Sequence, residues 1–168
     1  MRAELQVRQQ LVAGAQSLEV DIRLKNEGSD AWYLVWYDTR TAYIDAPRRA
    51  LFYVEDLNRD PELLGCGGAN MFVAPNYKKL QAGSILTLRS QLQISSPRLS
   101  VADTSKQVGK PAVRPTLSAG AWTLSGRFAL LAESTPPSDL SGIPLCEYLS
   151  KNERHIETFL EIVVEADR

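Results

Sequence analysis

Apolar and polar residues alternate along most of the chain, which is the pattern of half-buried β-strands. The clearest segments cover residues 18–25, 85–94, 122–130 and 156–164. In the first, every second residue is apolar and the residues between are charged: Leu18, Val20, Ile22 and Leu24 against Glu19, Asp21, Arg23 and Lys25. In the last, the inward set is Ile156, Thr158, Leu160, Ile162 and Val164, and Glu157, Glu161 and Glu165 face outward.

Residues 31–37 predict a strand that is apolar on both faces, with Tyr33, Val35 and Tyr37 on one of them. Such a strand is usually covered on both sides or lies at an interface, and we favour the covered interpretation. Residues 51–57 and 71–73 predict further strands, and only residues 140–152 have room for a short helix.

Seven to eight strands with hardly any helix predict an all-β fold, a two-sheet antiparallel sandwich formed by residues 1–168 as one domain. A closed barrel is the alternative, because period-two alternation does not distinguish the two architectures. Two connections, residues 95–119 and 132–154, are long for such a fold, and loops of this length are often functional.

The composition excludes several classes of protein. The 168 residues carry a net charge of -1, which argues against a globally basic nucleic-acid-binding protein. The run at residues 31–37 is far shorter than the ~20 apolar residues of a membrane helix. No signal-peptide pattern opens the sequence, which leaves a cytosolic protein and an exported protein with its signal removed as open alternatives.

The small net charge conceals a segregation along the chain. Residues 75–127 hold eight basic residues and one acid, and residues 133–168 hold eight acids and three bases. We expect the two regions to compensate each other, with the last strand beside the strand that carries Arg127. The alternative is a basic loop that attracts an acidic partner. Nucleic acid is a poorer partner, since no Phe, Tyr or Trp lies between Lys79 and Arg114 for bases to stack on.

Catalytic and metal-binding motifs are missing from the sequence. It has no His-Glu-x-x-His, EF-hand, Gly-x-Ser-x-Gly or Walker pattern, and it has a single histidine, His155. A solvated histidine at a strand end is the favoured interpretation, although pairing with Cys66 as nucleophile and base is conceivable. We therefore predict a protein that is not an enzyme and uses no cofactor or metal.

Cys66 and Cys146, the two cysteines, either form one disulfide or stay reduced. Successive loops of an antiparallel sandwich alternate between its ends. The two cysteine loops therefore share an end only if residues 71–73 do not cross the sheet, so the pairing stays open.

Three short pieces of the sequence are similar to turns of known immunoglobulin-like bacterial domains. They are Leu24-Lys-Asn26-Glu-Gly28 with Leu34-Val-Trp36-Tyr37, then Leu80-Gln-Ala-Gly83-Ser, and then Leu117-Ser-Ala-Gly120-Ala-Trp122-Thr-Leu124. Over residues 17–131 the set resembles the bacterial intracellular proteinase inhibitor family and the amino-terminal sandwich of deuterolysin-type metallopeptidases. The resemblance implies an immunoglobulin-like fold and a binding or inhibitory role. It assigns no functional residue, because the matching positions are turns.

The leading functional hypothesis is a protein-binding module, with a peptidase inhibitor as its specific form. Loops at one end of the sandwich would bind the partner through the exposed tip at residues 38–49 and through four basic residues, Arg98, Lys106, Lys110 and Arg114. The alternative is an assembly component of the cell envelope that uses strand edges and apolar faces, with Tyr33, Val35 and Tyr37 as contacts. The oligomeric state is left open.

Overall fold

The computed structural model describes residues 1–36, 41–53, 76–96, 115–132, 139–140 and 142–167. These residues form one helix, α2 (Gly142–Asn152), and ten strands. The strands are β1 (Arg2–Val7), β2 (Leu11–Val12), β3 (Ser17–Lys25), β4 (Trp32–Trp36), β5 (Thr41–Ala46), β6 (Arg49–Tyr53), β7 (Asn76–Leu80), β8 (Ile85–Ser95), β9 (Gly120–Leu131) and β10 (Glu153–Glu165).

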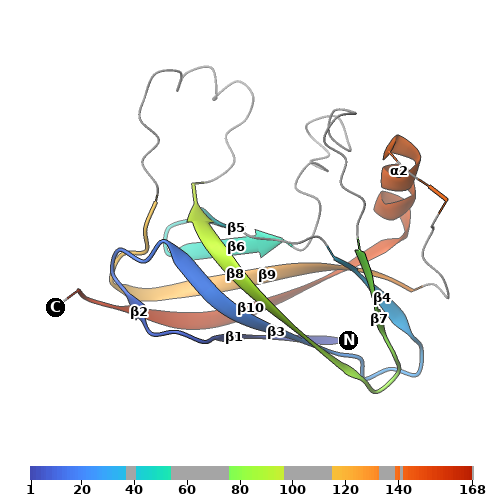
Figure 1. Ribbon diagram of the computed structural model, residues 1–168, viewed down its shortest axis with the longest axis horizontal. Coiled ribbons are helices and arrows are strands. Elements are labelled where there is room, and N and C mark those ends of the chain that lie inside the picture. The colour runs from blue at the N-terminus through green and yellow to red at the C-terminus, as the bar shows by residue number, and fades with distance from the viewer. Residues whose placement is uncertain (37–40, 54–75, 97–114, 133–138, 141, 168) are drawn as a thin grey trace.

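All ten strands belong to a single, strongly curled sheet, so the prediction of a two-sheet antiparallel immunoglobulin-like sandwich is wrong (Figure 1). Eight strands follow one another in the order β1-β3-β8-β5-β6-β9-β10-β2, and the β4–β7 pair branches from β9. The sheet is mixed, because β5 runs parallel to β8, β6 parallel to β9, and β2 parallel to β10.

The β5–β6 hairpin is the physical reason for the difference. It pairs with β8 on one side and with β9 on the other, and so joins two antiparallel groups that would otherwise form separate layers. Its turn contains Arg48, which has a positive φ of 61° and donates from Nη1 to the carbonyl of Ala119 at 2.6 Å. The Arg48 carbonyl accepts a bond from the Thr123 amide at 2.9 Å, which fixes the hairpin to the start of β9.

One hydrophobic core fills the inside of the curl, and every strand contributes to it. The inward sets predicted for residues 18–25 and 122–130 are buried, which confirms the alternation as a guide to the inner face. Inside β9, Gly126 makes room for Phe52, since a Cβ at this position would lie 2.7 Å from the Phe52 ring. Phe52 packs edge to face against Phe128 at a centroid distance of 6.0 Å.

Helix α2 forms in the region where the sequence had room for one, and it covers part of the outer face of the sheet. Leu145 and Leu149 pack there in a second buried cluster with Val35 and with two residues of β9, Ala129 and Leu131. Leu34, the neighbour of Val35, is buried in the main core. The prediction that this strand is covered on both faces is therefore confirmed for its two central residues.

Two of the turns that carry the family resemblance lie side by side. Asn26, at the end of β3, is 1% exposed, and its Nδ2 donates to the carbonyls of Asp30 (2.7 Å), Leu80 (3.2 Å) and Gln81 (3.1 Å). Its backbone pairs with the β7–β8 turn, donating to the Ser84 carbonyl and accepting from the Gly83 amide. One buried side chain therefore joins two turns that are distant in sequence.

Candidate functional site

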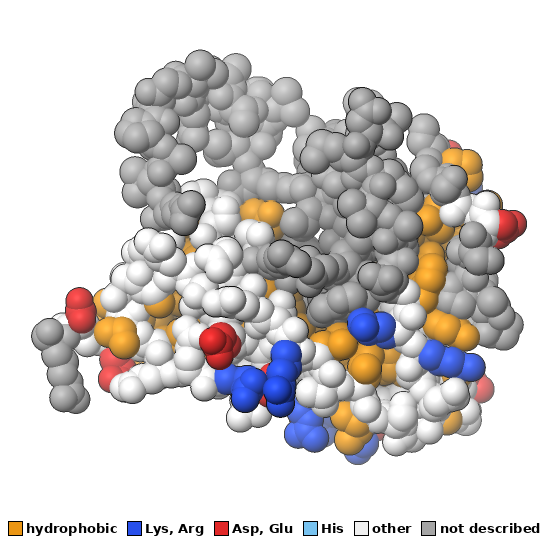
Figure 2. Space-filling view, viewed as in Figure 1, with side chains coloured by type: hydrophobic (Ala, Val, Ile, Leu, Met, Phe, Trp, Pro, Cys, Tyr) orange, Lys and Arg blue, Asp and Glu red, His pale blue; other side chains and the backbone are white. Residues whose placement is uncertain are grey.

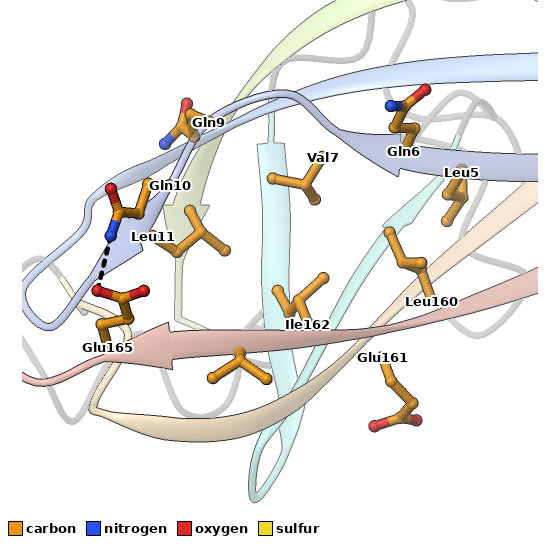
Figure 3. Close-up of a pocket in the computed structure, with 11 residues that line it drawn as sticks. Leu5, Gln6, Val7, Gln9, Gln10, Leu11, Leu160, Glu161, Ile162 and Glu165 are labelled. Carbon is orange, nitrogen blue, oxygen red and sulfur yellow. Dashed lines mark hydrogen bonds between the residues drawn. The ribbon is translucent and has the colours of Figure 1, made fainter.

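The curl of the sheet brings β1 beside β10 without pairing the two strands. β10 pairs with β9 along one edge, but its other edge pairs only with the short β2, at Val164 and Glu165. At the opposite end the Thr158 hydroxyl donates to the Ala3 carbonyl across the gap at 2.9 Å. We call the gap between these two closures the seam (Figure 3).

Hydrogen-bond alternation shows which backbone groups face the seam. The Arg8 amide donates to Glu19 of β3, so the alternate residues Ala3, Leu5 and Val7 direct their N–H and C=O groups away from β3. The Glu165 carbonyl accepts from Ala13 beyond β2, on the side away from β9. By the same alternation, Phe159, Glu161 and Val163 direct their backbone groups into the seam. The two strand edges therefore face each other without backbone pairing between them, and the Ala3 carbonyl accepts from the Thr158 hydroxyl.

A groove of about 420 Å³ follows the seam. Figure 3 shows apolar side chains from both strands pointing toward one another across it, and they form its floor: Leu5, Val7, Leu11, Leu160 and Ile162. The remaining lining residues are Gln6, Gln9, Gln10, Glu161, Val163 and Glu165. The groove thus has an apolar floor between two strand edges, and no lysine or arginine lies among its lining residues. The Glu161 carboxylate points away from the floor, toward Thr123 of β9 (Figure 3).

The outer face of β10 alternates acidic and apolar side chains. Phe159 and Val163 are 61% and 70% exposed, more than any other large apolar residue in the described part of the chain. The acids are held by neighbours: Glu157 by Arg127 at 3.7 Å, Glu161 by the Thr123 hydroxyl at 2.9 Å, and Glu165 by the Gln10 amide at 2.6 Å. The sequence analysis predicted correctly that these acids face outward, but it missed Phe159 and Val163. These two residues occupy the same outward positions of the alternation as the acids, and that signal was present in the sequence.

Most of the residues predicted to bind a partner lie outside the described residues: Arg98, Lys106, Lys110, Arg114 and Tyr37. Tyr33 is half-buried with the Lys79 ammonium 5.7 Å from its ring centre, and Val35 is buried beneath α2. The structure therefore does not bring these two residues together as an exposed patch. Cys66 and the side chain of Cys146 also lie outside the described residues, so the disulfide stays untested.

The predicted compensation of charge is confirmed at one position, where β9 and β10 pair and Arg127 meets Glu157. A second ionic group lies on β3 and its neighbours, where Asp21 is 3.5 Å from both Arg8 and Arg89. Figure 2 shows basic side chains gathered on the lower part of the visible face. At least one side chain of each ion pair is exposed to solvent, so each pair adds about 0–1 kcal/mol of stability.

Features of an enzyme or a metalloprotein are sparse in the part of the chain that the structure describes. His155 lies at the surface near the start of β10 with its Nε2 3.4 Å from a Glu153 carboxylate oxygen. Among the described residues, no three His, Cys, Asp or Glu side chains gather into a metal site. In the same residues no helix is long and apolar enough to cross a membrane.

Comparison with known proteins adds no relative. No family model, no curated protein and no solved structure matches the chain. The resemblance to the proteinase inhibitor family and to the deuterolysin-type domain therefore stays a prediction.

Proposed function

We propose that this chain is a non-enzymatic protein-binding module that binds an extended segment of a partner protein at the seam edge of β10, with β1 moving aside to admit it. The supporting observation is the pair of unpaired edges above an apolar floor. Strand addition supplies affinity through backbone hydrogen bonds and specificity through alternating side chains, and both elements are available in the seam. An inhibitory action through residues 97–114 stays a separate prediction, because that loop lies outside the described residues.

A capped six-residue peptide with alternating valine and threonine, labelled with fluorescein, tests the proposal. We expect its anisotropy to rise with added protein, and Val163→Pro to weaken binding at least tenfold. Proline at this position removes an amide that faces the seam and leaves the β9 ladder complete. Ile85→Pro is the matched control, an exposed position on a strand outside the seam. Equal binding by the wild type and Val163→Pro would refute strand addition.

A second candidate function is assembly through the outer face of β10, and it is favoured by the exposure of Phe159 and Val163. Phe159→Lys should then abolish a concentration-dependent oligomer in sedimentation equilibrium. Ile85→Lys, at a position 53% exposed, is the matched control. A chain that stays monomeric at all concentrations would refute assembly with copies of itself.

A further inference from the structure

We infer that the hydrogen bond from the Thr158 hydroxyl to the Ala3 carbonyl is a latch that controls entry to the seam. While the latch is closed, β1 covers the edge of β10. When it opens, β1 swings outward from its Ala3 end and admits the partner segment. The inference rests on the proposed function and specifies how that same site is regulated.

A partner strand does not fit into the closed seam. Cα atoms of β1 and β10 lie within 8 Å of one another across it. Neighbouring strands of a sheet are about 4.8 Å apart, so a segment seated between the two would hold them roughly 10 Å apart. β1 must therefore move outward before a segment can pair with the edge of β10.

The end of the seam next to β2 is held by several bonds. β2 pairs with the last residues of β10, and the Gln10 amide donates to the Glu165 carboxylate at 2.6 Å. The Gln9 side chain donates to the Ser17 carbonyl at 3.0 Å and accepts from the Glu19 amide at 3.1 Å, which ties the connection between β1 and β2 to β3. Figure 3 shows both glutamines at the β2 end of the groove. This end is therefore the hinge of the opening movement.

The Ala3 end is held more weakly. In the described part of the chain, the latch is the one hydrogen bond that joins β1 to β10. β1 also contributes little to the core, because Leu5, at 9% exposed, is its one buried residue, and Ala3 and Val7 are partly buried. Opening this end breaks one bond, uncovers a small apolar area and keeps the ladder between β1 and β3. The latch is therefore the contact that decides how often the seam is open.

Removal of the latch has an effect of known sign. A site that is open in only a fraction of the molecules binds with an apparent affinity reduced by that fraction. Loss of one hydrogen bond changes such an equilibrium by about threefold to tenfold. Thr158→Val keeps the branched shape of the side chain and removes the hydroxyl, so it should raise the open fraction and tighten peptide binding by the same factor. A threonine that only stabilises the fold would leave binding unchanged or weaken it.

Fluorescence anisotropy with the labelled valine–threonine peptide tests the latch in the full-length chain. We expect Thr158→Val to bind about three to ten times more tightly than the wild type, because the open fraction rises. Thr158→Ser keeps the hydroxyl and should restore wild-type binding. Thr87→Val is the matched control, an exposed threonine on β8 outside the seam, and should stay within about twofold of the wild type. Equal or weaker binding by Thr158→Val would overturn the latch.

Relaxation-dispersion NMR on the free chain measures the open fraction without any peptide. Exchange at the amides of Ala3, Leu5 and Phe159 should increase in Thr158→Val and return to the wild-type level in Thr158→Ser. If this exchange increases but no variant binds the peptide, the proposed function fails and the latch remains. If the wild type binds the peptide and Thr158→Val changes neither the exchange nor the binding, the latch fails and the proposed function remains.

Discussion

Asn26 offers the sharpest test of how the fold is held together. Its buried side chain donates to three carbonyls and accepts from the Gly28 amide at 3.2 Å, and in this way joins the β3–β4 and β7–β8 turns. Asn26→Ala removes all of these bonds at once. The carbonyl of Leu80 lies in a buried setting, so water does not readily replace the lost donor.

The expected loss is large for a single polar residue. A typical intramolecular hydrogen bond contributes about 1 kcal/mol, and an amide has two N–H groups and one oxygen in use here. We therefore expect Asn26→Ala to lower the free energy of unfolding by about 3 kcal/mol. In a domain of this size that corresponds to a fall of roughly 6–12 °C in Tm.

Urea denaturation followed by tryptophan fluorescence measures the loss. Asp30→Ala and Gln81→Ala are matched controls, because these residues accept the bonds through their main-chain carbonyls, and both should stay within about 0.5 kcal/mol of the wild type. A loss below about 1 kcal/mol in Asn26→Ala, or an equal loss in Asp30→Ala, would show that the side-chain bonds do not hold the turns.

Two further perturbations test other parts of the fold. Gly126→Ala places a methyl group 2.7 Å from Phe52 and should lower the free energy of unfolding, measured by urea denaturation, by about 1–3 kcal/mol. The double variant Gly126→Ala/Phe52→Leu should recover part of the loss. Stability of Gly126→Ala equal to the wild type would contradict this packing. The hydrogen bond and charge of Lys25 lower the pKa of the exposed Glu27 carboxyl, so Lys25→Met should raise that pKa in a carbon-detected NMR titration. Any stabilisation from this pair is present above the ordinary glutamate pKa and lost as the pH falls through the lowered value, and an unchanged Glu27 pKa would refute the assignment.

The inner face of each long strand could be predicted from the sequence, because burial on one side imposes strict alternation. This held for β3, β9 and β10, and for both faces of β4 around Leu34 and Val35. The number of sheets could not be predicted. It depends on the β5–β6 hairpin, whose residues 41–46 were interpreted as part of an exposed tip. Pairing between distant strands leaves no local signal in the sequence. Ala42 is fully buried, but nothing in the residues around it indicates that it belongs to the core.

The candidate site could not be predicted from the sequence, for a related reason. The seam exists only because the curl brings the free edges of β1 and β10 together, and free edges are a property of topology. The side chains nonetheless carried a usable signal. Phe159 and Val163 alternate with glutamates on the outward face, where large apolar residues have no structural requirement to be.

The parallel ladders of the β5–β6 hairpin also have a kinetic consequence. Thr41 must meet Gln93, and Arg49 must meet Thr123, before the two antiparallel groups become one sheet. Contacts between such distant positions form slowly, since the intervening chain loses entropy before they stabilise it. The hairpin should therefore dock late in refolding. Until it does, the edges of β8 and β9 that it covers would be exposed to other chains, which makes this the stage at which the protein is most prone to aggregate.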